Sequence, residues 1–465
     1  CVEIAVFALA LAAWRFPGEN GDPLGVRADM PSPQVACCGL KVAAKPEDWM
    51  ALVPDDAANA GYLRQELGLL HASFAQAPLL GSLLDPARSL KNDLATSSFE
   101  TLRDLLGKAL ATERPATLWG QSSELQDDSW DLALTAKGLL DAARLLDGRY
   151  QLVVTNVPYL ARGRQHEVLK SYCETHYPEA KQDLANVFLE RCLELSRDQG
   201  SGVVQIVMPQ NWLFLTSYKK QRESLLKRVQ WSLLARLGPG AFETISGEVV
   251  QAVLLTQTNA RATDGFQLRG VDASAPKGAK EKAEFLRDGE VVAVSQKGQL
   301  GNPDARILLE ESVAHVQLSN YAFTAQGIST TDGSRFVQQY WERANLEGGW
   351  EFFQAASTEQ TNGLVSGYNY TLRWGGPGSD YFNYIEELKK VGRIGGAWQA
   401  GRNAWGQVGF AINVTRNKAV ALYSGAKFDV TAGIMVPVRS EHATAVLSYL
   451  LDPAYEQELK ALDPS

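Results

Sequence analysis

A regular alternation of apolar strands and amphipathic helices between residues 150 and 258 constrains the fold more than any other feature of the sequence. Strands are predicted at 150–155, 203–209, 231–238 and 249–258, and helices at 183–197 and 216–228. Short glycine-containing joints connect them. Alternation at these lengths is typical of a doubly wound α/β sheet, with strands in the middle layer and helices on both faces.

Length, composition and cysteine content narrow the class of protein. The 465 residues, 45% of them hydrophobic, predict several domains with buried cores and exclude a disordered tail, a collagen-like fibre and a small disulfide scaffold. Five dispersed cysteines favour a reducing compartment, the cytoplasm, and the scattered Cys and His predict no metal site. The net charge of −8 argues against uniform coating of nucleic acid but allows one basic face.

The chain opens on Cys1 instead of Met, followed by an apolar stretch from Val2 to Trp14. A membrane-spanning helix needs about 20 residues, and this stretch is shorter and lacks the flanks of a signal peptide. We therefore expect a buried helix of an α/β core and no membrane association. The helix begins without a visible cap, so we expect the chain to be an N-terminally truncated fragment. A short strand is predicted at 34–42 and a capping box, Ser97 with Glu100, further along.

The motif Asn156-Val157-Pro158-Tyr159 follows directly on the predicted strand at 150–155. In open α/β sheets the carboxyl ends of the strands are where ligands bind. The Asn side-chain oxygen and the carbonyl of the next residue suit the two hydrogens of an exocyclic amino group. Pro158 fixes the turn, and Tyr159 offers a face on which a planar base stacks. The alternative is an ordinary strand-ending turn, because Asn and Pro are common turn residues.

Residues 150–258 resemble the catalytic half of the amino-methylating class I S-adenosylmethionine-dependent DNA methyltransferases. That family has a strand ending in Asn-Pro-Pro-Tyr, an Asp and a Phe on the following helix, a glycine turn, a strand ending in Pro and a helix with an Arg. The corresponding residues here are Asn156 to Tyr159, Asp183, Phe188, Gly200, Gly202, Pro209 and Arg222. The large adenine-specific methylases of type IIG restriction–modification and BREX-type phage-defence systems are the most similar. Residues 321–336 and 401–418 resemble parts of their target-recognition domain.

The resemblance implies a Rossmann-like methyltransferase sheet with a helical insertion, followed by a mixed α+β target-recognition domain. We expect the rest of the cofactor-binding half at 1–54, the insertion at 55–148, the catalytic half at 149–262, a linker or hairpins at 263–310 and a partial recognition domain at 311–465. The implied activity is transfer of a methyl group from S-adenosylmethionine to N6 of a flipped adenine in double-stranded DNA. Other defence-system subunits are implied as further partners.

Two departures from the family pattern concern activity and cofactor binding. Val157 stands where the family usually has Pro, which keeps the carbonyl and loses some rigidity. The glycine-rich cofactor loop does not occur in the sequence, and we expect it upstream of Cys1. We therefore do not expect these 465 residues to hold the methyl donor properly on their own. The residues that correspond to cofactor contacts are Glu3, Cys38, Gly39, Asp183 and Phe188. Alternatives remain: Glu3 as a surface or packing residue, Asp183 as a helix-start residue and Phe188 as a core residue.

Contacts to DNA are expected from a locally basic stretch. Residues 371–420 hold seven basic against three acidic residues, a local charge of +4, interleaved with tryptophans. Phosphates need such charge, and base edges are read by Arg, Asn and Gln. The candidate DNA-binding residues are Arg162, Arg164, Arg373, Arg393, Trp398, Arg402, Trp405, Arg416 and Lys418. The alternative is a solvated surface over a small core that contains the Trp residues.

Two other functions compete with DNA adenine methylation. A non-catalytic DNA-binding specificity module would carry Asn156 to Tyr159 as a relic. Glutamine-methylating enzymes of protein release factors share the motif, but they are small and lack a recognition domain. Cys173 and Cys192 are interpreted as packing residues, because amino methylation needs no covalent enzyme nucleophile.

Overall fold

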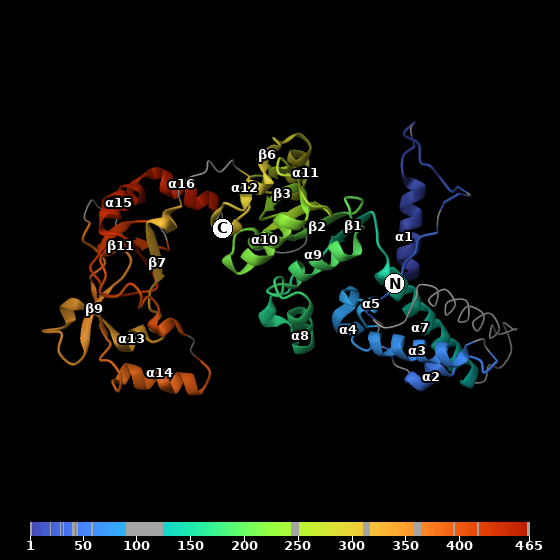
Figure 1. Ribbon diagram of the computed structural model, residues 1–465, viewed down its shortest axis with the longest axis horizontal. Helices are drawn as coiled ribbons and strands as arrows, with labels where there is room; N and C mark the ends of the chain where they lie inside the picture. The colour runs from blue at the N-terminus through green and yellow to red at the C-terminus, as the bar shows by residue number, and fades with distance from the viewer. Residues whose placement is uncertain are drawn as a thin grey trace. The chain divides into compact units, whose positions relative to one another are not determined.

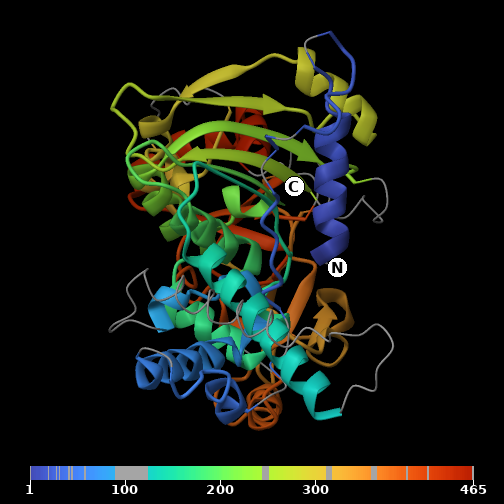
Figure 2. The same cartoon turned by 90° about the vertical axis from the view of Figure 1, so that its right-hand side faces the viewer.

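The computed structural model describes residues 2–18, 20–27, 29–30, 32–39, 42, 45–56, 59–89, 124–242, 251–309, 317–357, 364–393, 396–415 and 418–462. The chain divides into two compact units, Cys1–Glu311 and Ser312–Ser465. Figure 1 labels the elements of each unit, and Figure 2 gives a second view of them.

The first unit is built on a six-stranded sheet with the order β1-β2-β4-β3-β5-β6. β1 is parallel to β2 and β3 is parallel to β5, while the other neighbours are antiparallel. The prediction of an α/β sheet is confirmed, with mixed strand directions. The strands are β1 (Leu152–Asn156), β2 (Val203–Pro209), β3 (Gln230–Gly238), β4 (Ala252–Thr258), β5 (Gln267–Asp272) and β6 (Val292–Ser295).

Two helices, α9 (Leu184–Leu195) and α10 (Lys219–Arg228), pack with the sheet around one hydrophobic cluster. β2 alternates buried and half-buried residues, as expected for a strand in a half-covered sheet, and it contributes Val204, Ile206 and Met208 to the cluster. Leu189 of α9 and Leu225 of α10 are also fully buried there. Val153 of β1, the strand that leads to the motif, packs against the same cluster.

The segment at 263–310, predicted as a linker or hairpins, is part of the sheet. It contains β5, β6, α11 (Ala279–Asp288) and α12 (Gln296–Gln299), and β5 pairs with β3. The prediction failed because only isolated residues of these strands, such as Leu268 and Val294, reach the core, so the apolar periodicity is weak. Gly270 on β5 leaves room for the Leu309 side chain, because a Cβ there would lie 2.2 Å from its Cδ2.

Helices of different lengths form a second hydrophobic cluster in this unit, the helical cluster, around the buried residues Trp49, Leu67, Phe74 and Leu140. The predicted capping box, Ser97 with Glu100, lies outside the described residues. The described helices are α2 (Pro46–Met50), α3 (Ala60–Phe74), α4 (Ala77–Leu80), α5 (Pro86–Ser89), α7 (Glu124–Asp147) and α8 (Glu167–His176).

Two predictions for the N-terminal region are wrong. The apolar stretch does form a helix, α1 (Val2–Arg15), but none of its residues is buried, and Ile4 is 72% exposed. The predicted strand at 34–42 is not regular in residues 32–39, because its apolar side chains pack against the helical cluster instead of pairing with the sheet. In the parts of the chain that the structure describes, every helix is too short or too polar to cross a membrane.

The second unit contains two four-stranded sheets, with the orders β13-β9-β10-β8 and β12-β11-β14-β7. The strands are β7 (Ala322–Gln326), β8 (Val337–Gln339), β9 (Trp350–Gln354), β10 (Tyr370–Arg373), β11 (Gly409–Asn413), β12 (Val420–Tyr423), β13 (Lys427–Phe428) and β14 (Ala432–Pro437). Helices α13 (Gly333–Phe336), α14 (Asp380–Lys390), α15 (Ala443–Leu451) and α16 (Pro453–Leu462) accompany them. Gly401, at φ +76°, allows its loop to approach Phe428 closely, because a Cβ there would lie 2.4 Å from that ring.

Candidate functional site

The motif lies at the carboxyl end of β1, beside the parallel strand β2. Asn156 is the last residue of β1 and pairs in register with Val207. Its side chain is exposed, as is Pro158, whereas Val157 is buried at 5% exposure in the cluster behind the sheet. Tyr159 is half-buried and packs against the same cluster. The polar group of Asn156 therefore faces outward from a strand end that is anchored by Val157.

The motif loop, which comprises the motif and Leu160 directly after it, is hydrogen-bonded to the start of α9. The Asp183 carboxylate accepts hydrogen bonds from the backbone N–H of Ala185, at 2.9 Å, and of Leu160, at 3.4 Å. Leu184 N–H donates to the Leu160 carbonyl at 3.1 Å. Asp183 is thus the N-cap of α9 and at the same time a tie to the motif loop. This position matches the helix-start alternative for Asp183.

A second tyrosine, which the sequence did not single out, lies near the same carboxylate. Burial, followed by the charge of Asp183, raises the pKa of Tyr159, and the same two causes raise the pKa of Tyr218 to about 12. Tyr218 precedes α10, in the loop that leaves the carboxyl end of β2. The Tyr159 hydroxyl is covered by protein without a hydrogen-bond partner. The position of Tyr218 after the second strand of a parallel pair is the signal by which the sequence could have identified it.

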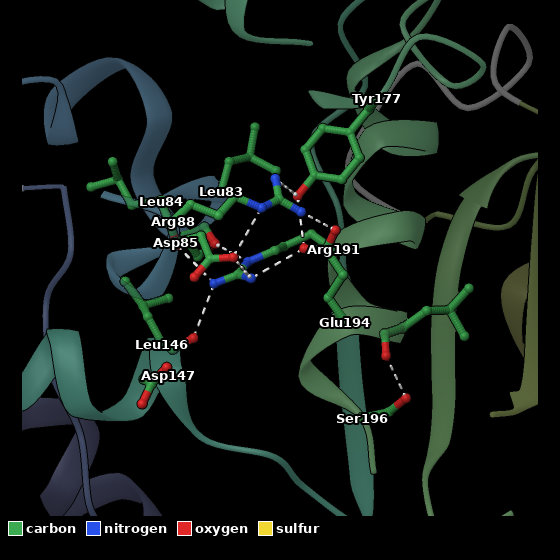
Figure 3. A network of polar contacts seen from close by, with 12 residues as sticks. Leu83, Leu84, Asp85, Arg88, Leu146, Asp147, Tyr177, Arg191, Glu194 and Ser196 are labelled. Atoms are coloured by element: carbon green, nitrogen blue, oxygen red, sulfur yellow. Dashed lines mark hydrogen bonds and ion pairs between the residues drawn. The ribbon is translucent and has the colours of Figure 1, made fainter. Parts of the chain in front are cut away.

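A buried ionic network holds the helical cluster against α9 (Figure 3). Arg191 on α9 is 1% exposed and donates to the carbonyls of Leu84, at 2.8 Å, and Leu146, at 3.0 Å. It also pairs with Asp85 at 3.4 Å and Glu194 at 3.2 Å. Arg88 pairs with both of these carboxylates, and the Tyr177 hydroxyl donates to Glu194 at 2.9 Å. The network fixes the helix whose first residue ties down the motif loop.

Arg222 fixes the loop that follows β2. Arg222 lies on α10, a helix rich in charged residues, and its side chain is fully buried. Its guanidinium donates to carbonyls on two segments, Trp212 and Leu215 after β2 and Asp304 and Ala305 near the end of the unit. Burial, the largest cause, lowers the pKa of Arg222 to about 10. Arg222 is charged at neutral pH, and four carbonyls stabilise that charge.

The five residues predicted to contact the cofactor are spread over three parts of the first unit. Glu3 is exposed on α1, which matches the surface alternative. Cys38 and Gly39 precede α2; Cys38 packs on the helical cluster, and burial raises the pKa of its thiol. Asp183 and Phe188 belong to α9, where Phe188 packs between the two clusters. The structure therefore does not bring these five residues together into a single cofactor site.

The two arginines just past the motif differ in their surroundings. Arg164 is exposed. Arg162 pairs with Glu174 on α8 at 3.1 Å, and Glu174 also accepts from Lys181 at 2.6 Å. Hydrogen bonds from Lys181 and Arg162 lower the pKa of Glu174. Two cations therefore share one carboxylate beside the motif loop.

In the second unit, the two tryptophans that were predicted to contact DNA, Trp398 and Trp405, pack in the interior. Trp398 is 4% exposed and stacks on Trp374 with ring centroids 6.0 Å apart. Trp405 is half-buried between the two clusters of this unit. The Lys427 ammonium lies 4.9 Å from the ring centroids of both Trp374 and Trp405 and pairs with Glu351 at 2.6 Å. For Trp398, this burial agrees with the alternative of a small core and not with contact to DNA.

The basic residues of this unit that were predicted to contact DNA lie mostly at its surface. Arg373 pairs with Asp380 at 2.9 Å, and Arg402 lies over Trp405 at 5.8 Å. Arg393 is exposed, and Lys418 is half-buried. Arg416 lies outside the described residues. Within the described ranges, no group of three or more His, Cys, Asp and Glu side chains is placed to hold a metal ion.

The family is decided by comparison with known proteins. A family model described as "Eco57I restriction-modification methylase" matches residues 2–240. The chain belongs to this family. The matched range includes the helical cluster, the motif and α9.

Two curated relatives share parts of the chain. The adenine-specific methyltransferase PglX of Lacticaseibacillus casei is 29% identical over 49% of this chain and 17% of its own length. The adenine-specific methyltransferase BrxX of Escherichia coli is 37% identical over 24% of this chain and 9% of its own length. The chain therefore spans less than a fifth of the length of either relative in the matched regions.

Among solved structures, the type IIL restriction–modification enzyme MmeI in complex with DNA has a TM-score of 0.37 and 11% identity, covering 64% of this chain and 42% of MmeI. The type ISP enzyme LlaBIII bound to DNA has a TM-score of 0.38 and 9% identity, covering 81% of this chain and 30% of LlaBIII.

Proposed function

We propose that the protein is an adenine-specific DNA methyltransferase of a restriction–modification or phage-defence system. It transfers a methyl group from S-adenosylmethionine to N6 of an adenine flipped out of double-stranded DNA. The observation that carries the proposal is the motif from Asn156 to Tyr159 at the carboxyl end of β1, in a chain of the Eco57I methylase family. Because the substrate is DNA of the host cell, we place the activity in the cytoplasm.

The chain's own residues contribute binding, orientation and polarisation. The Asn156 side-chain oxygen and the Val157 carbonyl accept the two hydrogens of the adenine amino group, which raises electron density on the nitrogen and directs its lone pair outward. Tyr159 stacks on the flipped base. Asp183 holds the loop that carries Tyr159 by accepting the Leu160 N–H. When bound, S-adenosylmethionine would supply the electrophilic methyl group.

The second unit is proposed as the target-recognition domain. Its exposed cations Arg373, Arg393 and Arg402 suit contacts to phosphates and base edges. Other defence-system subunits are proposed as further partners.

Product analysis tests the proposed specificity. The purified protein is incubated with S-adenosylmethionine and unmethylated duplex DNA, and the nucleosides are separated by mass spectrometry. The expected product is N6-methyladenine. Methylated cytosine as the product would refute the adenine specificity. Binding to DNA without any methyl transfer would support the alternative of a specificity module with a relic motif.

A further inference from the structure

We propose that Arg162 and Lys181 form a binding site for a backbone phosphate of the target DNA strand, and that Glu174 occupies this site when DNA is absent. This inference rests on the proposed function and adds a contact and an internal competitor to it. The site is separate from the residues that bind the adenine amino group, and it carries charge without reading sequence.

The two cations come from segments that are fastened side by side. Arg162 N–H donates to the Gln182 carbonyl at 2.9 Å, and Ala161 forms an antiparallel bridge with Asp183. Lys181 is the next residue along the partner segment. Backbone hydrogen bonds thus hold both side chains beside each other, and each reaches the Glu174 carboxylate on α8.

The charge on these residues is unbalanced. Arg162 and Lys181 carry two positive charges and share one carboxylate, and Arg164 adds a further exposed cation. Two other acids flank Lys181 along the chain: Glu179 is exposed, and the Asp183 carboxylate accepts the backbone N–H groups of Ala185 and Leu160. A backbone phosphodiester carries one negative charge shared by two oxygens, so it can accept from both cations in place of the shared carboxylate.

The position of the site relative to the pocket selects a phosphate of the DNA strand as the ligand. Arg162 is the third residue after Tyr159, which is at most about 11 Å of extended chain. A nucleotide extruded onto Tyr159 brings its flanking phosphates past the mouth of the pocket. Glu174 is 52% exposed at its side chain, so it is free to turn toward solvent when a phosphate replaces it.

The test is the salt dependence of binding to a fluorescent duplex, measured by anisotropy on the purified protein. Lys181→Met removes one phosphate contact, so the plot of log affinity against log salt concentration becomes shallower, its slope smaller in magnitude by about one. Glu174→Gln removes the internal competitor, so binding to DNA tightens and the slope becomes steeper. Opposite changes from two variants are not expected from a loss of folding.

A lysine–carboxylate pair of the same kind at the other end of the sheet gives matched controls. Lys297, at the start of α12 after the edge strand β6, pairs with Asp264 at 3.1 Å. Lys297→Met and Asp264→Asn are expected to leave the slope unchanged. The proposal is overturned if Lys181→Met and Glu174→Gln also keep the wild-type slope while wild-type protein binds and methylates DNA. Wild-type protein that does not bind DNA would overturn the proposed function together with this site.

Discussion

Replacement of Arg191 by Met tests whether the network in Figure 3 holds the helical cluster against α9. Met keeps most of the apolar stem but removes the donors to the carbonyls of Leu84 and Leu146 and the pairing with Asp85. Arg191 is 1% exposed, so the carbonyls lose their partners without gaining water. Removal of one partner from a buried ion pair costs about 3 to 5 kcal/mol.

Hydrogen exchange of native protein measures this loss locally, which matters in a chain of two units. Peptides that cover α5 and the end of α7 are expected to exchange at least about a hundredfold faster in Arg191→Met, the equivalent of about 3 kcal/mol. Arg64→Met is the control, because Arg64 pairs with an Asp55 that is 97% exposed and is worth about 1 kcal/mol or less. Equal exchange rates in the two variants would refute the proposal that this network holds the helical cluster against α9.

Three further predictions concern the motif loop and the cysteines. Tyr159→Phe removes a covered hydroxyl without a partner and should keep methyl transfer, whereas Tyr159→Ala should weaken DNA binding by about 1 to 3 kcal/mol in titrations. Asp183→Ala should lower the free energy of unfolding by about 1 kcal/mol and reduce transfer, and Asp183→Asn, which keeps the acceptor oxygen, should restore most of the stability in urea melts. Burial raises the pKa of Cys173 from 9.0 to about 11 and that of Cys192 to about 12, so their contribution to stability is complete below pH 9 and is lost as the pH rises through these values. The double Ser variant should flatten the alkaline decline in melting temperature and retain transfer; loss of transfer would contradict the packing role.

The sequence predicted those elements whose signal is local. β1, β2 and α9 were predicted close to their observed bounds, because each has an uninterrupted apolar run or a clear helical period between turn residues. β5 and β6 were missed, because few of their residues reach the core and their neighbours are charged.

Buried arginines were beyond sequence reasoning for a different reason. Arg191 and Arg222 stand among charged residues on amphipathic helices, which is the pattern of a solvated face. Their partners are carbonyls 107 and 83 residues away, and carbonyls have no sequence signature. Trp398 was misjudged similarly, because an aromatic residue among basic ones has the same pattern whether it faces DNA or packs in a core.

The most direct test of the account is methyl transfer to duplex DNA by Asn156→Ala. Full-length wild-type protein is expected to transfer labelled methyl groups to adenine, and Asn156→Ala in the same protein should be slower by about a hundredfold or more, the usual effect of removing one group that stabilises developing charge. Asn211→Ala is the control, because Asn211 is an exposed asparagine in the loop after the neighbouring strand. Undiminished transfer by Asn156→Ala, or no transfer by wild-type protein, would contradict the assignment of the motif at the end of β1 as the adenine site.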